Sequence, residues 1–280
     1  MDFHKVVADM PSSLLPFLVE PNELEHQLGQ ESILLVDLSK PETYTQAHIP
    51  GAVHLDYAQI VAANKPVMGL LPSESQLNEV LSSIGLTPEH HVIAYDDEGG
   101  GRASRLLWTL EAMGHTRFSL LNGGLHSWTL ERRPLKGGTE TRARSQYQVQ
   151  RREAVIADKT YILKHLGDAA VVLLDTRTVD EYLGSKRFAE RGGHIPGAVN
   201  LDWMQTMDRN RGLRFKPAEE LHAMLVSLGV TPDKEVVCYC QSHHRSAHSC
   251  MMLKSLGYPR VRGYPGSWSE WGNSPDTPIE

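Results

Sequence analysis

One of the three cysteines of this chain lies where a thiol could be ionised and used as a nucleophile. Cys240 follows an apolar, strand-like run, and the sequence Cys-Gln-Ser-His-His-Arg leads from it to a helix-like segment that begins at Ser246. A helix N-terminus offers backbone N–H groups that the helix does not use, together with the positive end of its dipole, and both favour a thiolate. We therefore predict that Cys240 is a nucleophile whose pKa lies well below the roughly 8.5 of a free thiol.

The same segment could hold a small anion close to the sulfur. Its side chains add hydrogen-bond donors and positive charge, and its backbone N–H groups add more. The candidate anion-binding residues are Gln241, Ser242, His243, His244 and Arg245, with both histidines expected to be partly charged.

The thiols could have two other roles, packing and metal binding. Cys238 and Cys250 are interpreted as packing residues, since free cysteines are often buried. Zinc could take nitrogen and sulfur ligands from Cys238, Cys240 and the two histidines, but the four would crowd into seven residues. Tetrahedral zinc sites usually draw their ligands from separated pairs, so a metal site is not expected.

The chain repeats itself, which changes the meaning of every motif inside it. Residues 48–56, His-Ile-Pro-Gly-Ala-Val-His-Leu-Asp, return as residues 194–202, His-Ile-Pro-Gly-Ala-Val-Asn-Leu-Asp. The apolar run 92–96 returns in the same way as 236–240. Two copies of one domain are therefore joined head to tail.

Each copy alternates short apolar runs with segments of helical period. The predicted strands are 32–37, 91–95 and 117–121 in the first copy and 170–175, 235–239 and 260–262 in the second. The predicted helices are 74–84, 102–113, 217–228 and 246–256. This alternation predicts two α/β domains, each a mostly parallel sheet with helices on both faces.

The first copy lacks the cysteine. Alignment of the repeats places Asp96 at the position of Cys240 and Arg102 at that of Arg245, with one more residue between them. This loop carries three carboxylates and should repel an anion. Its glycines, 99–101, are not followed by the Lys-Ser/Thr of a phosphate-binding loop, so we interpret them as a turn that needs positive φ. We predict an inactive domain over 1–133, a polar linker over 134–157 and a catalytic domain over 158–280.

The bulk composition excludes several classes of protein. The 280 residues are 40% hydrophobic and 22% charged, which is typical of a globular protein with two domains. A net charge of -6 lacks the basic footprint that nucleic acid or an anionic membrane requires. Met1 to Pro21 reads neither as a secretory signal nor as a transit peptide, and no run is long enough for a membrane span. We expect a cytoplasmic protein without a disulfide scaffold.

Taken together, these motifs resemble the tandem-domain rhodanese family of sulfurtransferases. The resemblance extends from about Leu34 to Asn273 and includes the repeated His-Ile-Pro-Gly-Ala and the Gly-Ser-Trp-Ser-Glu-Trp-Gly segment at 266–272. The loop of the second copy is similar to the Cys-Gln-Thr-His-His-Arg of certain bacterial thiosulfate sulfurtransferases. It differs from the Cys-Arg-Lys-Gly-Val-Thr of vertebrate-type enzymes and the Cys-Gly-Ser-Gly-Val-Thr of 3-mercaptopyruvate sulfurtransferases.

The resemblance implies a ping-pong reaction. Cys240 would take a sulfane sulfur from thiosulfate as a persulfide and pass it to cyanide or another thiophilic acceptor, such as a thiol, without a metal or organic cofactor. A 3-mercaptopyruvate sulfurtransferase and a persulfide carrier that serves a protein acceptor are alternatives. A cysteine-dependent phosphatase is more remote, because those loops place five residues between cysteine and arginine and this one has four.

The resemblance also identifies residues that would bind the donor. Relatives of the other two groups tend to carry an arginine where this chain has Glu181. Arg187 and Arg191, in an insertion before His194, are the candidates to replace that arginine. Asp175, at the end of a predicted strand, is expected to interact with the region of Arg245. The remaining candidate is Trp203, as a wall of the pocket.

Overall fold

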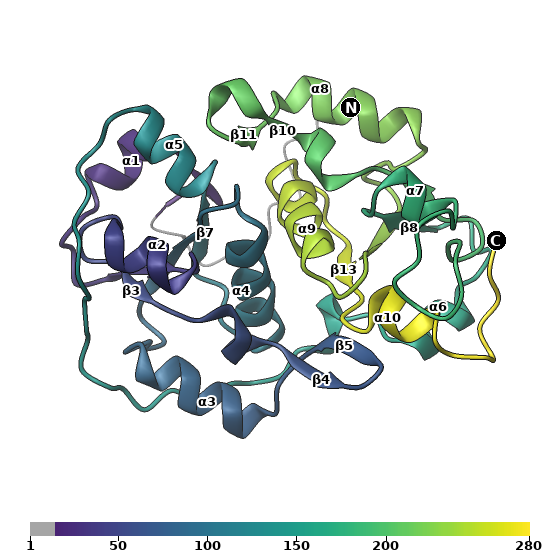
Figure 1. The fold of residues 1–280 in the computed structure, drawn as a ribbon, viewed down its shortest axis with the longest axis horizontal. Coiled ribbons are helices and arrows are strands. Elements are labelled where there is room, and N and C mark those ends of the chain that lie inside the picture. The colour runs from purple at the N-terminus through teal and green to yellow at the C-terminus, as the bar shows by residue number, and fades with distance from the viewer. Residues whose placement is uncertain (1–14) are drawn as a thin grey trace, which may run out of the picture.

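The computed structural model describes residues 15–280 and consists of two α/β domains (Figure 1). The first domain has a five-stranded parallel sheet and the second a four-stranded one. The order in the first sheet is β1 (Leu18–Val19), β7 (Phe118–Leu121), β6 (His91–Tyr95), β2 (Ile33–Asp37) and β3 (Val53–His54). The order in the second is β13 (Val261–Gly263), β12 (Glu235–Tyr239), β8 (Val171–Asp175) and β9 (Val199–Asn200).

Helices cover both faces of each sheet, as predicted. Those of the first domain are α1 (Pro21–Glu25), α2 (Pro41–Gln46), α3 (Glu74–Ser83), α4 (Gly101–Ala112) and α5 (Gly124–Leu130). Those of the second are α6 (Lys159–Lys164), α7 (Val179–Tyr182), α8 (Ala218–Ser227), α9 (Arg245–Ser255) and α10 (Ser267–Trp271). Short 3₁₀ turns are η1 (Tyr57–Ile60), η2 (Glu153–Val155), η3 (Trp203–Thr206) and η4 (Arg209–Arg211). The elements that the sequence predicts begin and end within one residue of the observed ones.

The strands are apolar throughout because both faces of each sheet are buried. In β2, Leu34 and Val36 enter one hydrophobic cluster, whereas Ile33 and Leu35 enter a second cluster on the opposite face. Successive side chains of a strand point to opposite faces, so a sheet covered on both sides selects a continuous apolar run.

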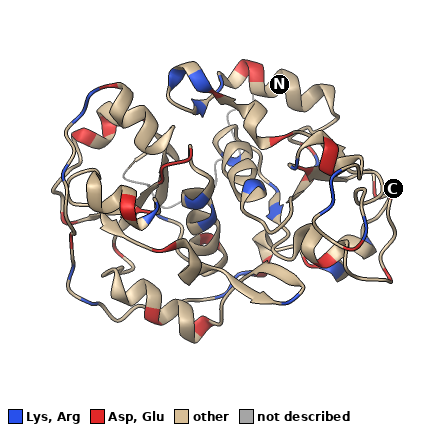
Figure 2. Cartoon of the chain, viewed as in Figure 1, with Lys and Arg blue, Asp and Glu red and all other residues tan. Residues whose placement is uncertain are grey.

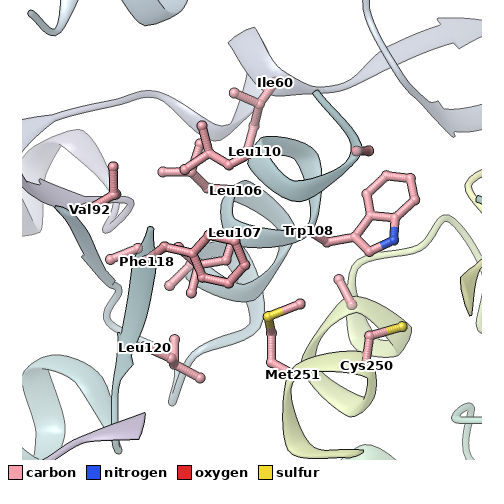
Figure 3. Packing of buried hydrophobic residues seen from close by; sticks show 14 of the residues in the cluster. Ile60, Val92, Leu106, Leu107, Trp108, Leu110, Phe118, Leu120, Cys250 and Met251 are labelled. Atoms are coloured by element: carbon pink, nitrogen blue, oxygen red, sulfur yellow. The ribbon is translucent and has the colours of Figure 1, made fainter. Parts of the chain in front are cut away.

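The two domains share one core. α4 of the first domain packs along α9 of the second, and Trp108 on α4 belongs to the same buried cluster as Cys250 and Met251 on α9 (Figure 3). An ion pair of 2.7 Å between Lys254 on α9 and Glu111 on α4 crosses the same interface. The shared core brings together the N-terminal turns of the two helices that follow the aligned loops.

Each domain also lays a β-hairpin on the other. The hairpin of β4 (Ala62–Asn64) and β5 (Val67–Leu70) reaches the second domain, where Met68 N–H donates to Ser269 Oγ at 2.9 Å. The hairpin of β10 (Met207–Asp208) and β11 (Arg214–Phe215) reaches the first, where Phe215 N–H donates to the Asn122 side chain at 2.9 Å.

The segment predicted as a linker lies on the first domain in an extended conformation. Tyr147 and Val149 are buried there, and the Gln150 N–H donates to the Met113 carbonyl at 2.9 Å. Figure 2 shows acidic and basic residues interspersed over both domains. No helix among residues 15–280 is long and apolar enough to cross a bilayer. The first fourteen residues of the predicted domain 1–133 lie outside the described part, and the domain limits remain predictions.

Candidate active site

Cys240 lies at the carboxyl edge of the second sheet, directly after β12, and is only 1% exposed to solvent. Ser246, in the first turn of α9, donates its hydroxyl to Cys240 Sγ at 3.4 Å. Burial raises the pKa of Cys240, but the charge of Arg245, the Ser246 hydroxyl and the N–H groups of Ser246 and Ser242 outweigh it. The net result lowers the pKa of Cys240 to about 7. This thiol is therefore substantially ionised at neutral pH.

The active loop, residues 240–245, is held in its curved shape by α10. Ser267 Oγ accepts the N–H groups of Cys240 at 3.3 Å and His243 at 3.2 Å, and donates to the Tyr264 carbonyl at 2.7 Å. His243 adopts φ +53°, a left-handed conformation that is uncommon for a side chain with a Cβ. The turn that curves the loop around the sulfur is thus stabilised by contacts from outside the loop.

Arg245 is paired with Glu181, the residue at the position where an arginine was expected. Its two terminal nitrogens bond both oxygens of Glu181 at 2.7 and 2.8 Å, and Thr178 also donates to that carboxylate. Burial disfavours the charge on Glu181, yet the bonds and charge of Arg245 lower the pKa of Glu181 to about 2. Glu181 therefore orients Arg245 and partly neutralises its charge beside the cysteine.

His243 does not carry the partial charge that the sequence led us to expect. Its ring is fully buried against Trp108 of the first domain, with ring centroids 4.2 Å apart, and its Nδ1 lies 2.7 Å from Ser246 Oγ. Burial holds the pKa of His243 well below its usual value, so the ring is neutral. Because the single hydroxyl proton of Ser246 is donated to Sγ, His243 Nδ1 is the donor to Ser246. His243 thus orients the serine instead of attracting an anion.

His244 faces the first domain and pairs with its acidic loop. His244 Nε2 lies 2.5 Å from Glu98 Oε1, and the ring lies edge-on to Tyr57 and Trp203, each 5.6 Å away between centroids. Two carboxylates of this loop are thus paired, Glu98 with His244 and Asp97 with Arg102, and the repulsion of anions by the loop remains a prediction. Trp203 contacts His244 of the active loop, and its role as a pocket wall remains a prediction.

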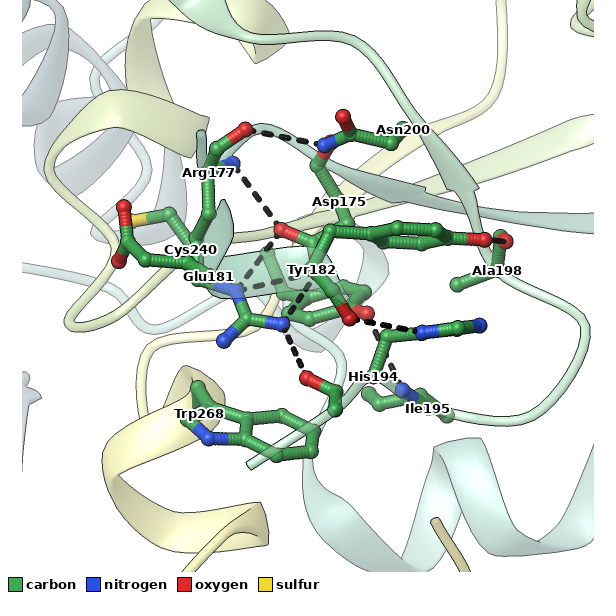
Figure 4. A network of polar contacts seen from close by, with 12 residues as sticks. Asp175, Arg177, Glu181, Tyr182, His194, Ile195, Ala198, Asn200, Cys240 and Trp268 are labelled. Carbon is green, nitrogen blue, oxygen red and sulfur yellow. Dashed lines mark hydrogen bonds and ion pairs between the residues drawn. The ribbon is translucent and has the colours of Figure 1, made fainter. Parts of the chain in front are cut away.

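Asp175 makes no hydrogen bond to Arg245, although its charge is among those that raise the pKa of Arg245. It is fully buried and forms an ion pair of 2.6 Å with Arg177, which also donates to the Gly193 carbonyl at 2.8 Å (Figure 4). The Arg177 guanidinium lies 4.4 Å from the Trp268 ring centroid. A carboxylate whose oxygens are already bonded by a neighbouring guanidinium has little capacity for a ligand. Because Arg177 also lies against Trp268, the pair connects β8 to α10.

Arg191 is likewise not available to replace the missing arginine. Its guanidinium donates to the carbonyls of Trp271 and Thr277, both at 2.9 Å, and so fixes the C-terminal segment. Arg187 is exposed, in the segment where the Phe188 carbonyl accepts the Gln241 side-chain amide at 3.0 Å. Of the two arginines in the insertion, Arg187 alone remains a candidate for donor binding.

The counterpart loop of the first domain, residues 96–102, holds a carboxylate where the active loop holds sulfur. Asp96 is fully buried and accepts the N–H groups of Glu98, Gly100 and Ala103 at 2.8 to 2.9 Å. Gly99 and Gly100 have φ of 92° and 110°, as predicted for this turn. Both domains therefore build an anion cradle from a loop and a helix N-terminus.

Several residues of the site could not be identified from the motif alone. Ser246 directly follows the motif, and its place in the first turn of α9 was a usable signal. Glu98 and the hairpin residue Gly69 come from the other domain. A Cβ on Gly69 would lie 2.0 Å from the Ser242 carbonyl oxygen, so the hairpin touches the active loop.

Comparison with known proteins agrees with this architecture. The family model described as "Rhodanese-like domain" matches residues 20–131 and 158–274. A protein of Azotobacter vinelandii named "Thiosulfate sulfurtransferase" is 43% identical over 95% of this chain and 97% of its own length. One of the same name from Pseudomonas aeruginosa is 41% identical over the same shares. The "Sulfur carrier protein TtuD" of Thermus thermophilus is 35% identical over 84% of this chain and 86% of its own. The crystal structure of YnjE superposes with a TM-score of 0.85 at 22% identity, covering 94% of this chain and 68% of that one.

Proposed function

The chain belongs to the rhodanese family, and on that premise we propose that it is a thiosulfate sulfurtransferase that works through a persulfide on Cys240. The observation that supports this most directly is a buried thiol with a pKa of about 7, held by N–H groups, a hydroxyl and a guanidinium. The relatives named "Thiosulfate sulfurtransferase" cover nearly the whole chain, both domains included.

In the first half-reaction, the Cys240 thiolate attacks the outer sulfur of thiosulfate. A bond forms between Sγ and that sulfur, the sulfur–sulfur bond of thiosulfate breaks, and sulfite leaves with the electron pair. Thiosulfate is a dianion, so positive potential is needed to offset its repulsion by the thiolate. Arg245 and the backbone N–H groups of the active loop supply it, and Arg187 is our candidate for the sulfonate end of the donor.

In the second half-reaction, the acceptor attacks the outer sulfur of the persulfide. With cyanide, a carbon–sulfur bond forms, the Sγ–sulfur bond breaks, and thiocyanate leaves while the Cys240 thiolate is restored. The persulfide is anionic near neutral pH, so the donors that hold the thiolate also hold this intermediate. The kinetics should be ping-pong, because the first product leaves before the acceptor binds.

The test is intact-mass analysis after incubation with thiosulfate and then with cyanide. The wild type should gain one sulfur atom that cyanide removes, and Cys240→Ala should gain none. Cys250→Ala, which removes the buried thiol on α9, is the matched control and should behave as wild type. A wild type that gains no sulfur, or a Cys240→Ala variant that still gains it, refutes the proposal.

A persulfide carrier for a protein acceptor is the second candidate, favoured by the likeness to the "Sulfur carrier protein TtuD". A carrier would form the same persulfide but pass it to cyanide slowly and to its partner protein fast. Incubation with 3-mercaptopyruvate in parallel ranks the donors. The proposal includes a reducing compartment, the cytoplasm, since Cys238, Cys240 and Cys250 are all free thiols.

A further inference from the structure

Arg105 of the first domain is a fully buried guanidinium next to the active loop of the second. It lies on α4, one turn from the helix start, and its pKa is lowered by burial. Among residues 15–280, no carboxylate forms an ion pair with it. An arginine keeps its proton in proteins, and a buried charge without a counter-charge is costly. Arg105 therefore needs an anion nearby to offset its burial.

The hydrogen bonds of Arg105 go to backbone carbonyls of two structures that meet at the active site. Nη1 donates to the His243 carbonyl at 3.2 Å, and Nη2 donates to the Gly69 and Leu70 carbonyls at 2.8 and 3.2 Å. The guanidinium also lies 5.2 Å from the centroid of the Trp108 ring. One side chain thus joins α4, the β4–β5 hairpin and the active loop.

The bond to the His243 carbonyl acts on the most unusual backbone of the loop. His243 has φ +53°, and the carbonyl of one residue and the N–H of the next point to opposite sides of a trans peptide. By holding the His243 carbonyl, Arg105 fixes the direction of the His244 N–H at the start of α9. The hairpin adds to this restraint, because Gly69 is packed directly against the Ser242 carbonyl.

Two groups of negative charge act on Arg105 when ionised, Tyr57 and Cys240. Burial raises the pKa of Tyr57 to about 12, so that hydroxyl is neutral near pH 7. The other charged groups around the active loop are already paired, Glu181 with Arg245 and Glu98 with His244. The remaining negative charge that acts on Arg105 is therefore that of Cys240, and the bond to the His243 carbonyl places the guanidinium against the loop that carries this sulfur.

We propose that Arg105, supplied by the domain without a cysteine, is a positioning residue of the active site that holds the active loop and complements the anion on Cys240. The kinetic part of this proposal rests on the proposed sulfurtransferase function. The part that concerns ionisation does not, because it can be measured on the resting protein without a sulfur donor.

Two substitutions separate the charge of Arg105 from its hydrogen bonds. Arg105→Met removes the charge and should raise the midpoint of Cys240 ionisation by about one pH unit, the size expected for loss of a nearby charge. Arg105→Lys keeps the charge but cannot bond three carbonyls in a planar fork. It should keep the midpoint close to wild type while the KM for thiosulfate rises about five- to ten-fold, an effect of roughly 1 to 1.4 kcal/mol on binding. The change in kcat should be smaller.

The midpoint is read from the ultraviolet absorbance of the thiolate, because Cys240 is too buried for a rapid alkylation assay, with Cys240→Ser as the blank. Glu111→Gln is the matched control, since it breaks another α4–α9 contact far along the interface from the loop. It should leave both the midpoint and KM unchanged.

If the midpoint of Cys240 ionisation in Arg105→Met equals that of wild type, Arg105 does not stabilise the charge on Cys240. If the KM of Arg105→Lys for thiosulfate equals that of wild type, Arg105 does not position the active loop. If Glu111→Gln changes the ionisation midpoint and KM as much as the Arg105 variants do, a loosened domain interface explains both effects. That result also overturns the proposal. If Arg105→Met does not fold, the KM of Arg105→Lys still decides. A wild type that forms no persulfide refutes the function instead, and the absorbance titration remains valid.

Discussion

Substitution of Glu181 by glutamine should make Cys240 more acidic and the protein less stable at the same time. Glu181 binds both terminal nitrogens of Arg245, and Arg245 is the first of the groups that lower the pKa of Cys240. Glu181→Gln keeps one carbonyl oxygen for hydrogen bonding but removes the negative charge. More of the positive potential of Arg245 then acts on the sulfur, so the midpoint of Cys240 ionisation should fall below about 7 by roughly half a unit to one unit.

The cost to stability follows from the pKa of Glu181. The shift from 4.5 to about 2 corresponds to an upper limit of about 3 kcal/mol at roughly 1.36 kcal/mol per unit. The Arg245 side chain is 18% exposed, and solvent screens part of the interaction. We therefore expect Glu181→Gln to lower the free energy of unfolding by about 1 to 2 kcal/mol at pH 7.

The pH dependence has a definite sign. A carboxylate whose pKa is depressed in the folded state contributes stability above its unfolded pKa, and this is lost as the pH falls through the folded value. The difference in unfolding free energy between wild type and Glu181→Gln should thus be constant above about pH 5. It should shrink as the pH falls from 4.5, the ordinary pKa of the group, towards its folded pKa of about 2. Urea unfolding from pH 7 to pH 4 measures it, and the thiolate absorbance measures the cysteine.

The control is Asp180→Asn, which removes the same charge from the neighbouring residue of α7. Asp180 is exposed and bonds Ser185, not Arg245, so neither quantity should change beyond a few tenths of a unit or of a kcal/mol. General loosening of the site would impair both stability and thiol acidity in Glu181→Gln. A midpoint that rises or stays at about 7 would therefore refute the reasoning, as would a variant as stable as wild type.

Two further predictions concern the thiol and the contact between the domains. Because the pKa of Cys240 is lowered from 9.0 to about 7, the stability contributed by its thiolate is complete above pH 9 and lost as the pH falls through 7. Urea unfolding should show wild type gaining stability over Cys240→Ser between pH 7 and pH 9, and a flat difference contradicts this. Glu98→Gln and His244→Asn should each lower kcat/KM for thiosulfate several-fold, with the double variant no worse than the more impaired single one. Fully additive losses in this double-mutant cycle would show that the pair of 2.5 Å does not act as a unit.

The parts of this structure that depend on local pattern could be predicted from the sequence. For the elements that the sequence predicts, period and composition give the limits within one residue, because both sheets bury both faces and each of these strands is a short, continuous apolar run. The repeat aligned Asp96 with Cys240, and the structure places both at a loop before a helix N-terminus.

The parts that depend on which distant residues meet could not be predicted. The sequence has Glu181 where an arginine is expected, but nothing in it shows that this carboxylate binds Arg245, 64 residues away. His243 and His244 are adjacent and identical in type, yet the first is buried and neutral and the second meets Glu98. The backbone at His243 is left-handed, and although histidine is enriched among the few non-glycine residues with positive φ, the sequence does not show which of the two histidines adopts it.

The counterpart loop explains why a domain without a nucleophile can still serve the reaction. Burial raises the pKa of Asp96 to about 6, but three N–H bonds favour its charged form, so at neutral pH the mostly ionised carboxylate fills the first cradle with negative charge. That cradle has no capacity left for a ligand, whereas the second holds the sulfur that, on our proposal, accepts and releases one more atom. Two charged side chains around the start of α4 then have partners across the interface, Glu98 in His244 and Arg105 in the His243 carbonyl. On these proposals the catalytic motif lies in one domain, while part of the electrostatic environment on which its chemistry depends is supplied by the other.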